Sequence, residues 1–226
     1  MNLHSTSPEV AMRRHDLAFV RPSAWCAQFI AREELKSLPL IAHWVDNGWP
    51  LIGRRGLPGE GHGIALGLPL PPFAGKRRLS FMMLREDIVK IDPPPALHIA
   101  AESAPLAWKP TMARIDALAS RHAVDARVFG SLAWRALTGL PYLTDRSDLD
   151  LLLYADHITD IHQLVAELAD VDHSAPMRLD GEVILKDGCA VNWRELHDGA
   201  EELLVKTACD ARLLETNRFL SRAVAA

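Results

Sequence analysis

The sequence predicts an α/β (α+β) chain of two domains, in which a small mixed sheet is followed by a larger mixed sheet flanked by helices. Short apolar stretches between glycines and prolines indicate the first sheet. Alternating helical and strand patterns indicate the second. The third observation is the run Pro93-Pro94-Pro95, which cannot continue a helix or a central strand. We place the domain boundary there, between residues 1–92 and residues 93–226.

Turn residues dominate the first domain. Seven of the 13 glycines lie between Gly48 and Gly67. The apolar stretches between these breakers suit strands of a small sheet, at 50–52, 64–66 and 79–84. One helix is expected near residues 24–35.

The second domain alternates between two periodicities. Apolar residues at helical spacing predict helices at 111–121, 132–137, 158–168, 195–205 and 210–224. Short apolar runs predict strands at 126–129, 149–154, 177–185 and 190–193. Strands that alternate with helices are typical of a layered α/β arrangement.

Composition and charge exclude several classes of protein. The chain has 226 residues, of which 49% are apolar, and this is enough to bury a core. The first domain holds 12 Lys and Arg against 9 Asp and Glu, and the second holds 13 against 20. An acidic balance without a basic helix argues against a nucleic-acid binder. No apolar run could span a membrane and residues 1–15 lack a signal core, so we expect a cytoplasmic protein.

A Gly-Ser pair stands where a predicted strand turns into a helix. Gly130 lets the backbone approach a ligand closely, and Ser131 adds a hydroxyl beside the free N–H groups of the helix start. Such a turn can hold a phosphate group. Gly130 and Ser131 are therefore candidate substrate-binding residues.

Two aspartates lead into a leucine-rich strand at 148–153. Because side chains alternate across a strand, Asp148 and Asp150 project from the same face. Paired carboxylates on a rigid strand suit Mg²⁺, above all Mg²⁺ that is shared with substrate phosphates. Two such ions can stabilise the entering and leaving oxygens of a displacement at phosphorus.

A two-metal site needs a third carboxylate, and the next strand offers two. Asp180 and Glu182 share one face of that strand, so the pattern alone leaves the choice between them open. We favour Asp180 because its side chain is shorter and stiffer. The candidate catalytic and metal-binding residues are thus Asp148, Asp150 and Asp180.

The Gly-Ser turn followed by Asp-Leu-Asp resembles the polymerase-β-like nucleotidyltransferase superfamily. In that superfamily the turn grips a triphosphate, paired aspartates bind Mg²⁺, and a third acidic residue lies on a later strand. Sixteen residues separate Ser131 from Asp148 here, and residues 138–143 look like a loop insertion. The resemblance implies a nucleotidyltransferase-like second domain with about two Mg²⁺ ions.

An ordered series of motifs in the first domain makes the resemblance more specific. The series consists of Arg-Arg-His-Asp-Leu at 13–17, Asn-Gly-Trp-Pro-Leu-Ile-Gly-Arg-Arg at 47–55, Gly-Leu-Pro-Leu-Pro-Pro at 67–72 and Gly-Lys-Arg-Arg-Leu at 75–79. Together with the second-domain site, it resembles the phosphoribosyl-dephospho-CoA transferases of malonate decarboxylase, also called holo-acyl-carrier-protein synthases.

The resemblance implies a reaction and a set of roles. The donor would be 2′-(5″-triphosphoribosyl)-3′-dephospho-CoA, and the acceptor a serine of the apo acyl-carrier subunit of malonate decarboxylase. Arg146 is a candidate phosphate clamp. Five basic residues of the first domain could bind the donor's phosphates or attract an acidic carrier: Arg54, Arg55, Lys76, Arg77 and Arg78.

Two other functions remain open from the sequence. One is a nucleotidyltransferase of the same superfamily that uses ATP or CTP on a small molecule or another protein. The other is a catalytically silent binding module on the same scaffold. Chemistry alone also cannot separate the malonate decarboxylase system from citrate lyase, because both use this prosthetic group.

Overall fold

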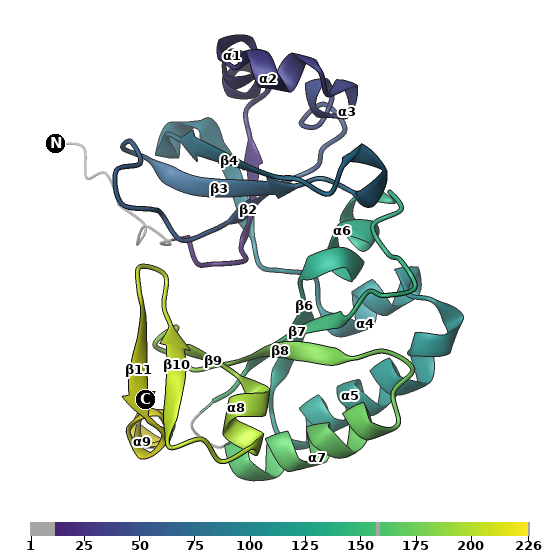
Figure 1. Cartoon of the computed structure of the whole chain (residues 1–226), viewed down its shortest axis with the longest axis vertical. Helices are drawn as coiled ribbons and strands as arrows, with labels where there is room; N and C mark the ends of the chain where they lie inside the picture. Colours follow the sequence, from purple (N-terminus) through teal and green to yellow (C-terminus); the bar gives the residue numbers. More distant parts are fainter. Residues whose placement is uncertain (1–11, 157–158, 226) are drawn as a thin grey trace, which may run out of the picture.

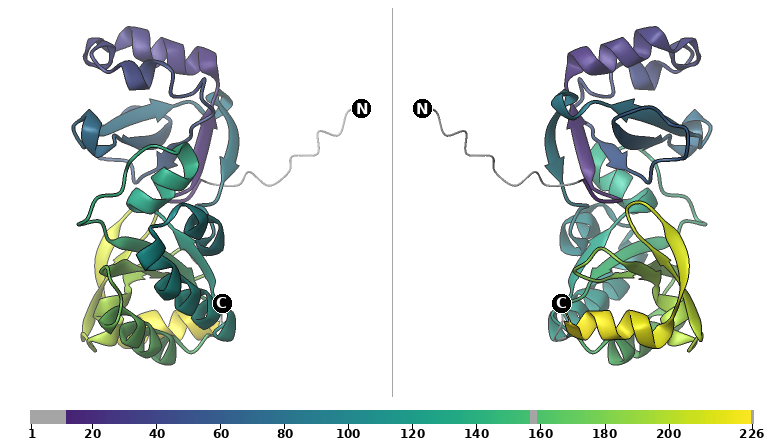
Figure 2. Two further views of the ribbon diagram at one scale, coloured as in Figure 1. Left: turned by 90° about the vertical axis from the view of Figure 1, so that its right-hand side faces the viewer. Right: turned by 90° about the vertical axis from the view of Figure 1, so that its left-hand side faces the viewer.

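The computed structural model describes residues 12–156 and 159–225, with the side chains of 224 and 225 left out. Residues 1–11, whose composition entered the expectation of a cytoplasmic protein, lie outside the described residues. Two sheets lie one above the other, and helices cover the outer side of each (Figures 1 and 2). In the described part of the chain, no helix combines the length and apolar character needed to cross a membrane.

The first sheet has five strands in the order β4-β3-β2-β1-β5, and each neighbouring pair is antiparallel. Its strands are β1 (Leu17–Val20), β2 (Leu51–Gly53), β3 (Ile64–Pro69), β4 (Arg78–Met83) and β5 (Ile88–Asp92). A mixed sheet was expected here, and that detail is wrong. Consecutive strands β2, β3 and β4 are joined directly by turns and loops, and such connections produce antiparallel neighbours.

The helices of the first part lie on the outer side of this sheet (Figure 2). They are α1 (Pro22–Ala31), α2 (Glu33–Lys36) and α3 (Pro39–Ala42), with the 3₁₀ turns η1 (Pro72–Ala74) and η2 (Arg85–Asp87) between strands. The single predicted helix at 24–35 is interrupted at Arg32, which has an extended backbone. The side chain of Arg32 donates to the Ser80 carbonyl at 2.7 Å and covers the Phe81 ring, so it ties the break to β4.

The second sheet has six strands in the order β11-β10-β9-β8-β7-β6. Its strands are β6 (Asp125–Val128), β7 (Leu149–Tyr154), β8 (Leu179–Ile184), β9 (Ala190–Asn192), β10 (Glu202–Lys206) and β11 (Ala211–Glu215). The pair β7–β8 is parallel and the other pairs are antiparallel. The predicted mixed sheet of the second part and the α+β class are confirmed.

Helices accompany this second sheet. They are α4 (Leu97–Ala100), α5 (Lys109–Arg121), α6 (Gly130–Thr138), α7 (Ile161–His173), α8 (Trp193–His197) and α9 (Thr216–Ala225), with η3 (Ala101–Ser103) and η4 (Leu106–Trp108). The predicted start of the fourth of these helices, Ile158, lies outside the described residues. The helix begins at Ile161, where the side chain of Asp160 accepts from Gln163 N at 3.0 Å and caps it.

The predicted helices at 195–205 and 210–224 are wrong in part. The helix α8 ends at His197, and the antiparallel hairpin β10–β11 takes up most of the next residues before α9 begins. Leu203 and Val205 are buried while Glu202 and Leu204 are exposed, which is the period of a strand. The helix predicted at 195–205 extended past the end of α8 and therefore obscured this alternation.

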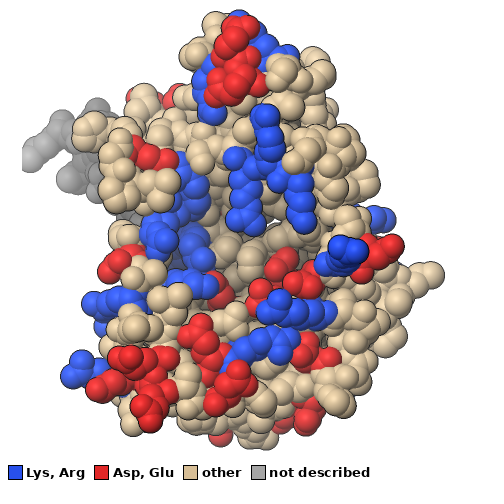
Figure 3. Space-filling model, viewed as in Figure 1, with Lys and Arg blue, Asp and Glu red and all other residues tan. Residues whose placement is uncertain are grey.

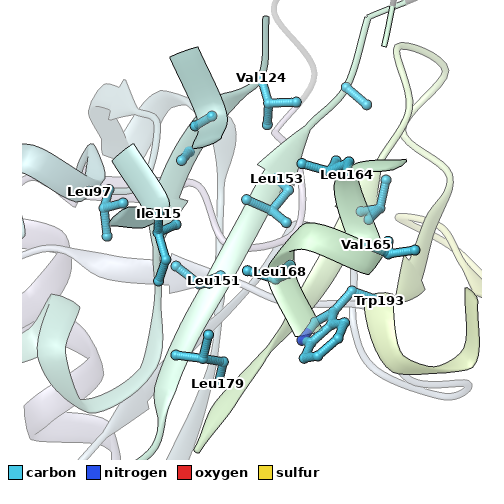
Figure 4. Packing of buried hydrophobic residues seen from close by; sticks show 14 of the residues in the cluster. Leu97, Ile115, Val124, Leu151, Leu153, Leu164, Val165, Leu168, Leu179 and Trp193 are labelled. Carbon is cyan, nitrogen blue, oxygen red and sulfur yellow. The ribbon is translucent and has the colours of Figure 1, made fainter. Parts of the chain in front are cut away.

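One face of the second sheet packs on α5 and α7. Leu151 and Leu153 of β7 and Leu179 of β8 point to this side, where they contact Ile115 and Leu168 in the main core (Figure 4). Because side chains alternate, the even-numbered residues of β7 and β8 point the other way, toward the first sheet. Burial of the leucines therefore fixes the direction in which the acidic residues of these strands project.

The two parts of the chain share a second core. Trp134 of α6 and Tyr142 of the following loop are buried among side chains of the first part, including Trp44. The Tyr142 hydroxyl donates to the Pro69 carbonyl at 2.8 Å. The segment 138–143, which the sequence presents as a loop insertion, thus contributes to packing between the two sheets.

Candidate active site

Asp150 and Asp180 stand side by side on parallel strands. They are register partners in β7 and β8, and Asp148, which directly precedes β7, is near enough for its charge to act on Asp150. The first part of the chain faces this side of the sheet. The structure thus places Asp150 and Asp180 next to each other, with Asp148 nearby.

The Asp150 carboxylate lies directly against the Gly-Ser turn. Phe129 is extended, α6 begins at Gly130, and Gly130 has a φ of 63°. A Cβ at Gly130 would stand 1.8 Å from Asp150 Oδ2, so only glycine leaves room for the carboxylate. The Ser131 N–H donates to that carboxylate. The turn and the aspartate therefore form one unit.

Asp150 carries an unusual charge environment. Burial raises the pKa of its carboxyl, and the charges of Asp180 and Asp148 raise it further, to about 7. The Ser131 hydrogen bond and the Arg78 charge act in the opposite direction and are weaker. Negative charge is thus concentrated at this point beyond what the surrounding residues neutralise.

Asp180 and Asp148 have partners of their own. Asp180 Oδ1 accepts from Asn192 Nδ2 at 3.0 Å and from Gly181 N at 2.9 Å. Asp148 is paired with Arg178, at 3.8 Å between Oδ2 and Nη1. Asn192, on β9, thereby orients the carboxylate that stands beside Asp150.

Glu182 is engaged elsewhere. Its carboxylate is paired with Arg14, accepts from Lys206 Nζ at 3.0 Å and lies 3.8 Å from His15 Nε2. Burial alone would raise the pKa of Glu182, but the neighbouring His15 ring, the Arg14 charge and Lys206 outweigh it and lower the pKa to about 2. Of the two carboxylates that the sequence offered on this strand, the geometry favours Asp180 as the third member of the site.

The carboxylate oxygens of the site are suitable ligands for a hard cation, although they are not grouped as a complete metal site in the described part of the chain. Within residues 12–156 and 159–225, no three His, Cys, Asp or Glu side chains are placed to hold a metal ion together. Oxygen ligands and the unrelieved negative charge around Asp150 are, however, what Mg²⁺ prefers. Asp148, Asp150 and Asp180 are the residues that would hold it.

A cavity of about 490 Å³ opens between the two sheets beside this site. Gly130 and Ser131 line one wall, and strands of the first sheet form the other. Basic side chains border the hollow in the middle of the molecule (Figure 3). We refer to this cavity as the cleft.

The cleft separates the basic candidates into groups. Four of them line it: Arg54, Arg55, Lys76 and Arg78. Arg77 and Arg146 are exposed and do not line it. Arg54 is already paired with Glu60, at 2.5 Å and 2.8 Å from its two terminal nitrogens. The five basic residues that looked equivalent in sequence therefore differ in position and in available charge.

Two residues of the Arg-Arg-His-Asp-Leu motif at 13–17 also line the cleft, although from the sequence a lead-in to the next apolar segment explains this motif nearly as well as a phosphate contact. These two residues are Arg14 and His15, and His15 has a φ of 74° with its ring 4.5 Å from that of Phe129. Asp16 is buried, which raises its pKa, and it accepts from Arg13 N at 2.7 Å. The polar run 13–16 before an apolar strand was the available signal. Nothing in the sequence marks Lys206 as a partner of Glu182.

Replacing Gly130 with alanine is expected to reduce activity at least about a hundredfold. The new methyl group would collide with Asp150 Oδ2, and the positive φ adds about 1 kcal/mol of strain. Gly139→Ala is the matched control, since Gly139 has a φ of 73° but nothing within 4 Å of its Cβ position. Both variants bear the strain of the positive φ, and Gly130→Ala should lose further stability in thermal unfolding through the collision. Equal activity of the two would show that the turn does not need to touch Asp150.

Comparisons with known proteins agree with both halves of this arrangement. Residues 13–94 match the family model described as the phosphoribosyl-dephospho-CoA transferase MdcG N-terminal domain, and residues 96–217 match the corresponding C-terminal domain. The chain belongs to the phosphoribosyl-dephospho-CoA transferase family. No solved structure matches it.

Relatives with this name cover nearly the whole chain. The phosphoribosyl-dephospho-CoA transferase of Bradyrhizobium diazoefficiens is 52% identical over 93% of each chain. That of Xanthomonas euvesicatoria is 37% identical over 89% of this chain and 93% of its own. The cleft takes one wall from each of the two family domains.

Proposed function

We propose that this chain transfers the phosphoribosyl-dephospho-CoA group from 2′-(5″-triphosphoribosyl)-3′-dephospho-CoA to a serine of the apo acyl-carrier subunit of malonate decarboxylase. Membership of the transferase family supports the group transferred. The observation that supports the mechanism is the Asp150 carboxylate against the Gly130–Ser131 turn, with Asp180 beside it. Bound Mg²⁺ would neutralise phosphate charge at these carboxylates.

The chemistry is an in-line displacement at phosphorus. The serine oxygen of the carrier forms a bond to the α-phosphorus, and the bond from that phosphorus to the departing pyrophosphate breaks. The serine proton needs an acceptor, and the oxygen of Asp180 that Asn192 does not hold is our candidate. The nucleophile comes from the partner, so the chain needs no catalytic serine of its own.

Charge builds on the departing pyrophosphate, and the cleft offers cations and N–H groups to receive it. Ser131 and the first turn of α6 face the cleft, and Lys76 and Arg78 line it from the opposite sheet. Electrostatic positioning of this kind provides most of the catalysis in phosphoryl transfer. We infer that these groups hold the triphosphate so that its α-phosphorus lies beside the carboxylates.

The test is the mass of the carrier protein. Purified chain, triphosphoribosyl donor, apo carrier and Mg²⁺ should yield a carrier heavier by one phosphoribosyl-dephospho-CoA group, with one pyrophosphate released per carrier. Removing the Mg²⁺ with EDTA should stop the reaction. An unchanged carrier mass, together with pyrophosphate release from ATP or CTP, would contradict the proposal and favour an ordinary nucleotidyltransferase. Failure of the chain to bind Mg²⁺ in calorimetry would favour a silent binding module.

A further inference from the structure

The basic residues of the cleft lie at two opposite ends of the first sheet. Arg54 N donates to the carbonyl of Ala65 on β3, whereas Arg78 is the register partner of Pro69 on the same strand. Four residues of strand separate these two levels, or roughly 13 Å at about 3.3 Å per residue. The strand β3 also stands between β2 and β4. The positive charge of the cleft is therefore divided between two places.

The first of these places belongs to the reacting site. Arg78 and Lys76 line the cleft together with Gly130 and Ser131. The charge of Arg78 also reaches Asp150, where it opposes the rise in that residue's pKa. We call this the carboxylate end of the cleft, and the triphosphate of the donor belongs there.

The second place, around Arg55, carries charge that the protein does not neutralise. Arg54 is paired with Glu60, and Arg14 shares Glu182 with Lys206. Arg55 is exposed at the cleft wall, and the described residues give its guanidinium no carboxylate partner. Of the three arginines that line the cleft here, Arg14 and Arg54 have a carboxylate partner, and Arg55 has none among the described residues. The positive charge here would attract an anionic group of a ligand.

Less polar surface connects the two ends. Ile52 and Gly67 are register partners between them, and both line the cleft, as does Leu68. A ligand that suits this wall has an anionic group at each end and an uncharged middle. The donor of the proposed reaction has this form, because two ribose rings separate its triphosphate from the diphosphate that joins adenosine to the pantetheine arm.

We propose that Arg55, with Arg14 beside it, binds the diphosphate of the dephospho-CoA part of the donor. This inference rests on the proposed function. The second end gives the site a means of choosing its donor, since ATP and CTP carry only the triphosphate. Arg55 is then a specificity-determining residue, while Lys76 and Arg78 hold the group that reacts.

Two simple ligands separate the ends in calorimetry of the full chain. Dephospho-CoA has the diphosphate without a triphosphate, and inorganic tripolyphosphate has the reverse. Arg55→Ala should weaken dephospho-CoA binding about tenfold and change tripolyphosphate binding less than about twofold, because one charge-assisted contact is lost. Lys76→Ala should show the opposite pattern. Arg85→Ala removes the same charge from an exposed residue of the first part outside the cleft lining, and it should change neither.

The outcomes distinguish this inference from the proposed function. If Arg55→Ala binds dephospho-CoA as tightly as the parent chain, or weakens both ligands equally, the assignment of the second end is overturned. Transfer to the carrier with the full donor is measured separately on the parent chain and tests the function alone. In that assay Arg55→Ala should raise KM for the donor and leave kcat within about twofold, since the lost contact holds the substrate throughout.

Discussion

Replacing Asp150 with asparagine is expected to lower the rate of transfer to the carrier at least about a thousandfold while the fold survives. Asp150 stands closest to the Gly-Ser turn and shares its charge environment with Asp148 and Asp180. Losing one group that positions and neutralises reacting phosphate costs about two to three powers of ten, and losing a metal ligand adds to this. Intact-mass analysis of the carrier measures the rate, and circular dichroism checks the fold.

We expect the same variant to be more stable than the parent chain near pH 8, although it is less active. The Asp150 pKa is about 7 in the folded chain, against an ordinary value of 3.8. In EDTA, the folded chain therefore keeps a proton that the unfolded chain loses, and stability falls as pH rises from about 4 to about 7. Asp150→Asn lacks this dependence. Its melting temperature should equal that of the parent near pH 4 and exceed it near pH 8.

The control is Asp145→Asn, which removes an exposed carboxylate from the loop that precedes β7. It should leave the transfer rate and the pH dependence of melting unchanged. Full activity of Asp150→Asn would remove the carboxylates from the mechanism. Lower stability of that variant at pH 8 would contradict the charge environment described for the site.

The core of the site was predictable because its signals are local. The bounds of β7 agree with the predicted strand at 149–154, in which Leu149, Leu151 and Leu153 are buried in the main core and alternate with residues of the opposite face. The same alternation placed Asp148 and Asp150 on one face. Gly130 and Ser131 were found because a strand, a glycine and a helix start follow one another directly. Local periodicity was enough for these elements.

The rest depends on contacts between distant parts of the chain. Glu182 and Asp180 are alike by strand pattern, and only the approach of Arg14, 168 positions earlier, and of Lys206 separates them. The strand β5 was missed because Val89 and Lys90 are exposed, which hides the apolar pattern of a strand. The sequence also could not show which of the five basic residues belongs to which end of the cleft. The register of β2, β3 and β4 decides this.

Glu182→Gln is expected to lower the free energy of unfolding by about 3 kcal/mol at pH 7 and to leave the chemistry largely intact. The variant keeps the shape of Glu182 but removes the charge that compensates Arg14 and Lys206, both of which are partly buried. Breaking a buried ion pair from one side costs about 3–5 kcal/mol. Chemical denaturation at constant temperature measures the difference.

The pH dependence and a control make this prediction specific. Because the Glu182 pKa is about 2 when folded and 4.5 ordinarily, its stabilisation is present above about pH 4.5 and disappears as pH falls toward 2. The difference between parent and variant should shrink over that range. Glu34→Gln, which breaks the exposed pair with Arg32, should show no measurable change.

Activity separates the roles of the two neighbours on β8. At a temperature where every variant is folded, Glu182→Gln should transfer the group within about tenfold of the parent rate, because Glu182 supports Arg14 and does not touch the reacting phosphate. Asp180→Asn should fall by a hundredfold or more, since Asp180 stands beside Asp150. The reverse order of rates would make Glu182 the third carboxylate, and the cluster around Arg14 would then belong to the reaction centre.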